Sequence, residues 1–312
     1  MELRPLMPMA EPLRLRVAIP HFFREVASDG YGSGRRGNRL ARSMALARCL
    51  GSVLGLNRAQ HDWILNIGQR QLELTPAPAL AGLPGLQVEL HLFVCGEHWL
   101  QEEVALFAPR LQLHQLELED PRLLPLAAVR QLLDIKPVAD LSLYLEDDLV
   151  IQDPCYADKL AWFNQRTEHR LVLMPHRYEQ AVANAPQRLF VDGPIKLEGQ
   201  PGPLWASDEV MAASGRFWDG QELSFVQAAN PHSGSFCLSG PQVEQLRDAA
   251  WPPASFVGPL ETAATGTVLG HFPVLKPSWA CRDFLTLEHG NPSFLSLLGE
   301  LPRREQVVPS LE

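Results

Sequence analysis

Three consecutive acidic residues interrupt an apolar stretch between residues 141 and 154. The stretch reads LSLYLEDDLVIQDP, so Glu146, Asp147 and Asp148 follow one mainly apolar run and precede another. Adjacent carboxylates repel one another, and each loses favourable hydration when it enters a protein cleft. A chain that places them there needs either bulk water or a bound cation around them.

A divalent cation suits three neighbouring carboxylates, because Mg²⁺ and Mn²⁺ prefer oxygen ligands. Side chains alternate along a strand, so Glu146 and Asp148 would share one side. One of them could face the metal ion while the other faces a nucleotide ribose or a bound water. The simpler interpretation is a solvated acidic turn, because clustered acids usually lie at the surface. The apolar residues on both sides of the triplet favour the metal site.

The elements that would position the triplet alternate between strand and helix over the first 175 residues. Apolar or alternating runs predict strands at 16–19, 88–95, 111–118, 141–145 and 171–175. Helical spacing predicts helices from 38 to 54 and at 98–108, 122–135 and 156–166, whereas 57–87 has no clear pattern. This alternation predicts a mainly parallel α/β sheet flanked by helices. Ligands bind beyond the carboxyl ends of the strands in such sheets, and the triplet directly follows the predicted strand 141–145.

The alternation ends at residue 175. Residues 176–230 are rich in Gly, Pro and Trp, which predicts long loops. Helices at 240–251 and 259–270 and a strand at 272–276 are predicted to complete the fold. The C-terminal half is therefore expected to be irregular.

The segment YLEDDLVIQDPCYADKLAWF (144–163) resembles the DxD region of glycosyltransferases with the GT-A fold. The resemblance is to the Glu-Asp-Asp form found in N-acetylglucosaminyltransferase I-type enzymes. In that family the last acid of the triplet binds Mn²⁺ and the earlier acids hold the nucleotide-sugar. The resemblance thus implies metal binding by Asp148 and donor contacts by Glu146 and Asp147. It is specific over this segment and architectural elsewhere, where it implies a GT-A-like, Rossmann-related sheet.

Two further segments resemble parts of the same family's donor site. RVAIPHFF (16–23) is similar to the first strand, whose end, here Pro20 and His21, supports the nucleotide base. NPHSGSFCLSG (230–240) resembles the glycine-containing loop between donor and acceptor, which implies a donor contact at Gly234. Small residues there let backbone N–H groups approach a ligand. An ordinary Ser/Gly turn is the alternative interpretation of this loop.

Two later segments carry the remaining implied site residues. GPLETAATGTVLGHF (258–272) resembles the segment with the acceptor-activating carboxylate of inverting enzymes, which implies Glu261 as general base. A Glu in a first helical turn is also common without any catalytic role, because the helix dipole favours it. DFLTLEHGNPSF (283–294) offers His289, since many GT-A enzymes take a further metal ligand from a C-terminal His. A neutral imidazole suits Mn²⁺ better than Mg²⁺, and a surface histidine is the alternative.

The stretch GSGRRG (32–37) matches the G-x-G-x-x-G pattern of dinucleotide-binding proteins. The first strand is predicted to end near Pro20, well upstream, whereas the fingerprint needs its glycines directly after the strand. NAD or FAD binding is therefore not expected. The start of the next helix carries four basic residues, Arg35, Arg36, Arg39 and Arg42. They could hold a diphosphate, but a solvated basic face is the preferred interpretation.

Composition narrows the function classes. The chain has 312 residues, of which 46% are hydrophobic, and a formal net charge of −9, which disfavours nucleic acid as a partner. Its five cysteines stand singly without a CxxC pair, so neither a disulfide framework nor a cysteine-based zinc site is expected. No apolar run is long enough to span a bilayer. A cytoplasmic protein is predicted.

These observations and the resemblance together predict one GT-A-like glycosyltransferase domain over residues 13–300, with tails at 1–12 and 301–312. Residues 13–175 would bind the nucleotide-sugar and residues 176–300 would form the acceptor side. The predicted reaction is the Mn²⁺- or Mg²⁺-dependent, inverting transfer of a hexosyl or N-acetylhexosaminyl group. The expected donor is UDP-linked, and the acceptor is a hydroxyl of a carbohydrate or glycoconjugate. The alternatives are a sugar-phosphate nucleotidylyltransferase and a non-catalytic carbohydrate- or nucleotide-binding protein on the same fold.

Overall fold

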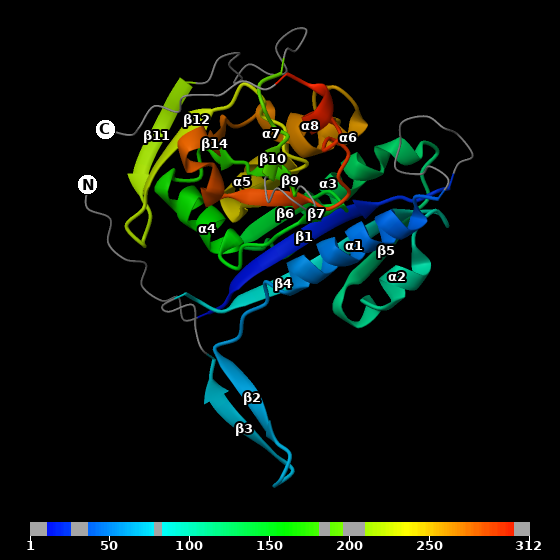
Figure 1. The fold of residues 1–312 in the computed structure, drawn as a ribbon, viewed down its shortest axis with the longest axis vertical. Helices are drawn as coiled ribbons and strands as arrows, with labels where there is room; N and C mark the ends of the chain where they lie inside the picture. The colour runs from blue at the N-terminus through cyan, green and yellow to red at the C-terminus, as the bar shows by residue number, and fades with distance from the viewer. Residues whose placement is uncertain (1–10, 26–36, 78–82, 181–187, 196–209, 303–312) are drawn as a thin grey trace.

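A five-stranded sheet forms the centre of the computed structural model, which describes residues 11–25, 37–77, 83–180, 188–195 and 210–302. Its strand order is β13-β6-β1-β4-β5 (Figure 1). The strands are β1 (Leu13–His21), β4 (Leu86–Cys95), β5 (Gln112–Leu116), β6 (Leu141–Leu145) and β13 (Ser235–Ser239). Four of them are parallel, and β13 pairs with β6 in the antiparallel sense. The expected mainly parallel α/β sheet flanked by helices is confirmed.

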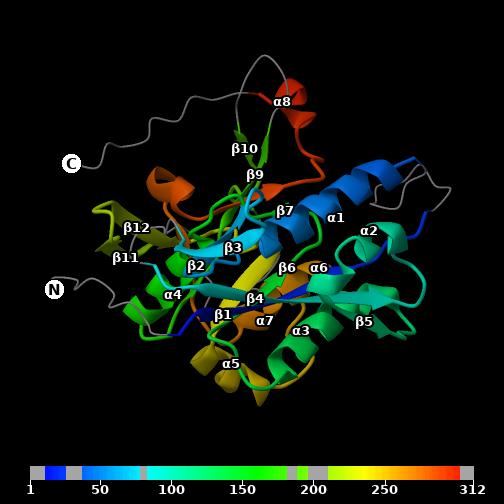
Figure 2. The same cartoon turned by 90° about the horizontal axis from the view of Figure 1, so that it is seen from below.

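Helices cover both faces of this sheet because the strand side chains alternate between two apolar cores. Val17 and Leu143 pack in the core under α1 (Arg39–Leu54), whereas Ala18 and Tyr144 pack in the core under α3 (Leu124–Asp134). Figure 2 shows α1 on one side of the sheet and α3 with α5 (Gly240–Arg247) on the other. The remaining helices are α2 (Gln101–Ala105), α4 (Tyr156–Arg166), α6 (Pro259–Glu261), α7 (Thr267–Leu269) and α8 (Leu297–Glu300). Short 3₁₀ helices lie at Ala108–Arg110, Pro121–Leu123 and Trp279–Phe284.

The C-terminal half adds two smaller sheets. One has the order β10-β9-β15-β7 and comprises β7 (Leu149–Val150), β9 (His176–Gln180), β10 (Arg188–Phe190) and β15 (Thr286–His289). The other has the order β11-β12-β14-β8 and comprises β8 (Val172–Leu173), β11 (Val210–Arg216), β12 (Glu222–Gln227) and β14 (Val274–Pro277). The expected boundary at residue 175 therefore does not divide the chain into separate sheets. Strand β13, from beyond the boundary, joins the central sheet, and β15, also from beyond it, pairs with β7.

Several predicted elements need correction. The strand expected at 171–175 is only β8, and it pairs with β14 outside the parallel sheet, because an apolar run does not specify which sheet buries it. The helix expected at 98–108 is limited to α2 and a later 3₁₀ turn. The helix expected at 259–270 contains a π-helical turn at Thr262–Gly266. Residues 57–87, which gave no clear pattern, contain the hairpin β2 (His61–Asn66) and β3 (Gln71–Pro76).

Within the described residues, no helix combines the length and the apolar character that crossing a bilayer would require.

The central sheet contains two neighbouring histidines, the buried His91 and the half-buried His114. His91 of β4 is 3% exposed, and its Nδ1 lies 2.9 Å from Nε2 of His114 on β5. Burial, together with the nearby His114 and Arg16, lowers the pKa of His91 from 6.5 to about 4. The unfolded chain therefore binds a proton on this residue at a higher pH than the folded chain does.

We expect the free energy of unfolding to fall as the pH drops from 6.5 to 4. The contribution from His91 should be about 2 kcal/mol, since one pKa unit corresponds to about 1.4 kcal/mol and nearby solvent weakens the effect. Urea unfolding at pH 7 and pH 4.5 measures this change. His91→Gln should lose part of the dependence, whereas the exposed His271→Gln should retain all of it. Equal pH dependence in wild type and His91→Gln would show that other groups cause the acid sensitivity.

Candidate active site

The acidic triplet lies at the carboxyl end of the central sheet. It follows β6, all of whose residues are buried and which runs parallel to β1. His21 ends β1 at the same edge and is fully buried. Its Nε2 accepts a hydrogen bond from the backbone N–H of Leu100 at 3.2 Å, which leaves Nδ1–H to donate to Asp147 at 2.5 Å. His21 thus contacts the triplet directly and fixes the orientation of Asp147.

Arg42 of α1 joins the two aspartates of the triplet. Its side chain is almost buried, with Nη2 2.6 and 2.7 Å from the oxygens of Asp147 and Nη1 3.0 Å from Oδ2 of Asp148. Burial alone would raise the pKa of Asp147, but Arg42 and the hydrogen bond from His21 outweigh burial and lower it to about 2. Asp147 is therefore an ionised anchor whose oxygens are already engaged by the protein.

Asp148 meets His289 although the two residues are far apart in the sequence. The end of β15 pairs with β7, which places His289 opposite Leu149, and the N–H of Gly290 donates to the carbonyl of Asp148 at 2.7 Å. Nε2 of His289 lies 3.5 Å from Oδ2 of Asp148. A carboxylate oxygen and an imidazole nitrogen thus face one another across a narrow gap.

Glu179 of β9 orients the imidazole from behind. Its side chain is completely buried and accepts hydrogen bonds from Nδ1 of His289 at 2.8 Å and from the N–H groups of Ser293 and Phe294 at 2.8 and 2.9 Å. Burial alone would lower the pKa of His289, but its contacts with Asp148 and Glu179 outweigh burial and raise it to about 9. Nδ1–H donates to Glu179, and at neutral pH Nε2 also carries a proton directed at Asp148, so a metal ion would bind Nε2 only by displacing that proton.

The Asp148–His289 pair fits two ligands of a Mn²⁺ or Mg²⁺ ion. One oxygen and one nitrogen donor match the preference of Mn²⁺, and a carboxylate behind a metal-binding histidine is the usual supporting arrangement. The described residues contain no group of three or more His, Cys, Asp or Glu side chains placed to hold a metal alone.

Glu146 is the member of the triplet that the protein leaves incompletely paired. It is 8% exposed, its Oε1 has no hydrogen-bond partner among the residues that the structure describes, and its Oε2 lies 4.0 Å from Nη1 of Arg177. Burial raises its pKa to about 8, although Arg177 opposes part of this rise. Gly234 makes the close packing possible, because a Cβ at its φ of +62° would lie 2.6 Å from Oε2 of Glu146. Only glycine fits beside the Glu146 carboxyl.

A buried ion cluster supports this side of the site. Arg177 donates from its backbone and guanidinium to Asp192 at 2.8 and 3.0 Å, and Nζ of Lys276 lies 3.3 Å from Asp192. Lys276 also donates to the carbonyl of His232 at 2.6 Å, so the cluster ties β9 and β14 to the loop that precedes Gly234. The two cations hold the pKa of Asp192 far below its usual range despite complete burial.

Glu261 lies on α6 at the border of this region. Its half-buried carboxylate folds back over Gly258, where an added Cβ would lie 2.8 Å from Oε2. The pKa values of Glu146 and Tyr144 are raised mainly by burial, and the nearby charge of Glu261 contributes to both rises. Glu261 is therefore within electrostatic range of the triplet, and the π-helical turn that follows it is a feature often found at functional sites.

The structure brings most of the sequence-predicted residues to one edge of the sheet. Asp148 and His289 are adjacent, Gly234 packs on Glu146, and His21 holds Asp147. Pro20 is buried in β1 opposite Phe93, and the ring nitrogens of His21 are both engaged, so neither side chain presents a free polar atom to a nucleotide base. Their expected donor contacts stay predictions, and the observed contact of His21 is with the triplet.

Sequence reasoning missed the residues that support the triplet and His289, namely Arg177, Glu179, Asp192 and Lys276, and it assigned Arg42 to the wrong environment. The expectation of a solvated basic face is wrong for Arg42, although it fits the exposed Arg39, which contacts Glu102 and Glu103. Arg35 and Arg36 lie outside the described residues. A usable signal existed, because Arg42 is spaced with Leu46, Cys49 and Val53 on the buried side of α1.

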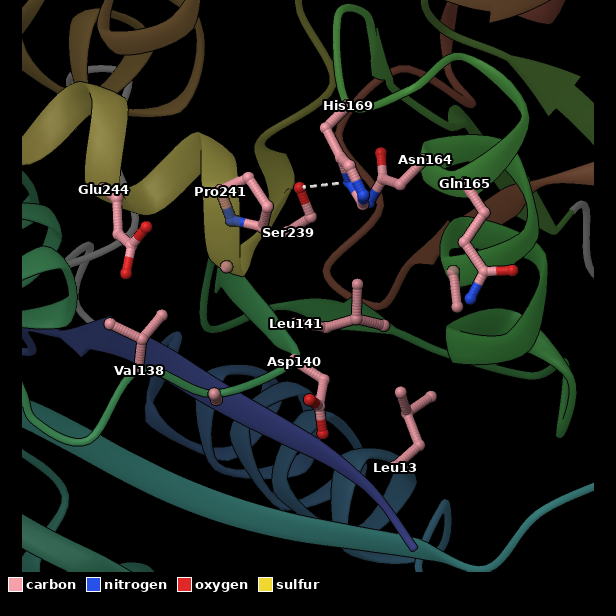
Figure 3. A pocket seen from close by; sticks show the side chains of 13 residues that line it. Leu13, Val138, Asp140, Leu141, Asn164, Gln165, His169, Ser239, Pro241 and Glu244 are labelled. Carbon is pink, nitrogen blue, oxygen red and sulfur yellow. Dashed lines mark hydrogen bonds between the residues drawn. The ribbon is translucent and has the colours of Figure 1, made fainter. Parts of the chain in front are cut away.

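A cavity of about 420 Å³ lies at the other end of the sheet (Figure 3). Its lining includes Leu13 and Leu141, the first residues of the parallel strands β1 and β6, together with Asn164 and the His169–Ser239 hydrogen bond of 2.9 Å. The triplet follows the last residue of β6. This cavity is therefore separate from the candidate active site.

The supporting role of Glu179 leads to a testable expectation. Glu179→Gln should weaken Mn²⁺ binding about 10- to 100-fold, because the amide no longer fixes His289 with Nε2 directed at Asp148. Calorimetric titration with MnCl₂ measures this, and thermal unfolding checks that the variant is folded. Glu288→Gln is the matched control, since Glu288 contacts Arg48 and Gln152 instead of His289. Unchanged Mn²⁺ affinity in a folded Glu179→Gln protein would remove His289 from the metal site.

Comparison with known proteins adds distant structural matches only. No protein-family model and no curated protein sequence matches the chain. TarS 1–349 of S. aureus in complex with UDP matches at 14% identity and a TM-score of 0.30, over 56% of this chain and 38% of that one. GalNAc-T7 with UDP, GalNAc and Mn²⁺ matches at 12% identity and a TM-score of 0.44, over 91% of this chain and 46% of that one. The chain spans less than half the length of either matched chain, and at these TM-scores the matches assign no activity to it.

Proposed function

We propose that this chain is a metal-dependent glycosyltransferase that moves a sugar from a nucleotide-sugar, UDP-linked, to an acceptor hydroxyl with inversion. The observation that carries the proposal is the meeting of Asp148 and His289 at the carboxyl end of the parallel strands, with Glu179 behind the imidazole. This placement is where α/β sheets bind ligands. A site with one carboxylate and one imidazole also leaves room for the diphosphate oxygens of a donor.

In this proposal Asp148 and His289 hold Mn²⁺ or Mg²⁺. The bound ion would act as a Lewis acid that stabilises the charge developing on the diphosphate leaving group. Arg42 and His21 hold the triplet in place by fixing Asp147, so Asp148 reaches the metal position without a large rearrangement. The chain thereby orients its ligand before the donor arrives, which favours binding.

Glu146 would hold the donor sugar or its ribose. Its unpaired Oε1 is a buried hydrogen-bonding atom, and a buried polar atom without a partner is unfavourable unless a ligand supplies one. The Glu146 carboxyl occupies the space that a side chain at Gly234 would take, so a donor contact at Gly234 would be made by its backbone. Glu261 would accept the proton of the acceptor hydroxyl as that oxygen attacks the sugar.

The two halves of the chain would contribute unequally to the site. Residues 13–175 supply the triplet, His21 and Arg42, which together form the donor side. Residues 176–300 supply Glu261 for the acceptor side, but they also supply Glu179, Gly234 and His289 to the donor side. Within a single domain at 13–300, the proposed donor half would therefore supply most of the donor side, and the proposed acceptor half would contribute to both sides.

The direct test combines ligand binding with turnover. A panel of UDP-, GDP-, ADP- and dTDP-sugars is screened by thermal unfolding with and without Mn²⁺, followed by an assay for released nucleoside diphosphate. We expect one donor class to raise the Tm in a Mn²⁺-dependent manner, because a ligand of the native state stabilises it, and to release its nucleotide. Stabilisation without any turnover, even with sugar acceptors present, would favour a non-catalytic binding protein. Release of pyrophosphate from a nucleoside triphosphate and a sugar phosphate would favour a nucleotidylyltransferase.

A further inference from the structure

The β2–β3 hairpin has one apolar face and one mainly polar face. Trp63 pairs with Leu74 and Leu65 pairs with Leu72, so these four side chains lie on the same face of the ribbon. The opposite face carries Ile64 among polar residues: Asp62, Asn66, Gln71, Glu73 and Thr75. This alternation is the pattern of a strand pair that buries one face.

No described part of the chain buries that face. The four side chains are 57–64% exposed, and Ile67 in the turn is 79% exposed. Figure 1 shows the hairpin projecting from the body of the molecule, away from the central sheet. An isolated two-stranded hairpin is at best marginally stable in water. A partner that covers the apolar face would supply the missing contacts.

We propose that a second copy of this chain covers the apolar face, with the two hairpins packed face to face about a two-fold axis. Identical patches are self-complementary in such an interface, and two-fold dimers are the commonest closed assemblies. The charges of the segment 61–76 argue against a lipid surface. It contains Arg70 as its only Arg or Lys, against Asp62 and Glu73, and the whole chain is acidic.

The size of the patch is sufficient for a specific dimer. At these exposures Trp63, Ile67 and the three leucines present roughly 400 Å² of apolar surface per copy. At an apolar share of about 60%, two such patches correspond to a total interface of roughly 1,300 Å². Specific interfaces bury about 1,200–2,000 Å², so the hairpin pair falls at the lower end of that range. A reversible dimer with a concentration-dependent population is expected.

The proposed dimer would leave the candidate active site open. The hairpin returns to the body through Arg58 and Leu86, whose backbones bond to one another at the first residue of β4. The triplet lies at the other end of the parallel strands. Dimer contacts and the site therefore lie at opposite ends of the sheet, and the inference does not depend on the proposed function.

Light scattering coupled to size-exclusion chromatography tests the proposal on the full chain between 1 and 100 µM. The wild type should approach a dimer mass as its concentration rises. Trp63→Asp should be monomeric throughout, with a dissociation constant raised more than about 100-fold, and Leu72→Asp on the paired strand should behave alike. Ile64→Asp is the matched control, because it replaces an adjacent, exposed apolar residue on the opposite face and should still dimerise. Unchanged thermal unfolding of the rest of the protein establishes that each variant is folded.

A monomeric wild type at 100 µM would overturn the proposal, as would dimers that persist in both Trp63→Asp and Leu72→Asp. Loss of the dimer in Ile64→Asp but not in Trp63→Asp would place the interface on the wrong face and equally overturn it. Co-sedimentation with phosphatidylcholine and phosphatidylglycerol vesicles should show no binding. If the wild type is monomeric and binds vesicles in a manner that depends on Trp63, the partner of the apolar face is a lipid surface and not a second copy of the chain.

Discussion

Asp148→Asn should lower Mn²⁺ affinity by more than about 100-fold and reduce sugar transfer in proportion. The substitution removes the carboxylate that faces Nε2 of His289 across the proposed metal position. Changes in residues that merely support a ligand already cost about 10- to 100-fold, and the loss of an anionic ligand should cost more. Because the donor diphosphate would be held largely through the metal, its affinity should fall together with that of Mn²⁺.

The fold should tolerate this substitution. Arg42 keeps its two contacts with Asp147, and His21 keeps its hydrogen bond to the same residue, so the turn after β6 remains anchored. Calorimetric titrations with MnCl₂ and with the nucleotide-sugar identified in the screen measure the two affinities. Asp153→Asn is a suitable control, since Asp153 lies just beyond the triplet but contacts Lys159 at 2.6 Å. Wild-type Mn²⁺ binding by a folded Asp148→Asn protein would show that the acidic triplet is not the metal site.

The parts of the molecule built from continuous, periodic segments were predictable from the sequence. The helix predicted at 156–166 has those bounds in α4, and LSLYL forms the buried strand β6 directly before the triplet. Local periodicity and the flanking apolar residues determine such elements. The position of the acids at the end of a parallel strand then follows from the connectivity of an α/β sheet.

The partners of the acids could not be predicted in this way. Glu179 and His289 come from β9 and β15, short strands whose pairing with each other and with β7 is set by tertiary contacts. Lys276 sits in the apolar run of β14, where a charged residue signals a buried partner without indicating which one. The pairing of short strands leaves little local signal in the sequence, because it depends on contacts between residues that are far apart in the chain.

The hairpin illustrates a signal that was present but not recognised. Leu72 and Leu74 alternate with polar residues on β3, whereas Ile64 interrupts the alternation of Trp63 and Leu65 on β2, and Gly68 lies in the turn between the strands. The alternation is short, and a Pro-rich stretch follows it at 75–85. A pattern of this kind is also ambiguous when neither face packs on the core, because the core then gives no support to the assignment.

Glu261→Gln should reduce sugar transfer by about 10²- to 10⁴-fold while donor binding with Mn²⁺ stays near that of wild type. The amide keeps the size and polarity of the side chain but cannot accept the acceptor proton, and a positioned general base contributes about this factor. The variant should fold normally, because the side chain of Glu261 makes no hydrogen bond or ion pair within the described part of the chain. The loss would therefore report on chemistry and not on stability.

Calorimetric titration of the nucleotide-sugar beside a product assay separates the possible roles of Glu261. Glu300→Gln, at the end of the short helix α8, provides a control and should leave both measurements unchanged. Near-normal transfer by Glu261→Gln would exclude it as the base. Glu146, whose buried carboxyl already has a pKa of about 8, would then be the next candidate for the base. The other explanation would be a retaining mechanism, which needs no such base. Lost donor binding would instead make Glu261 part of the donor site, and the metal site of Asp148 and His289 would remain to be judged by its own variants.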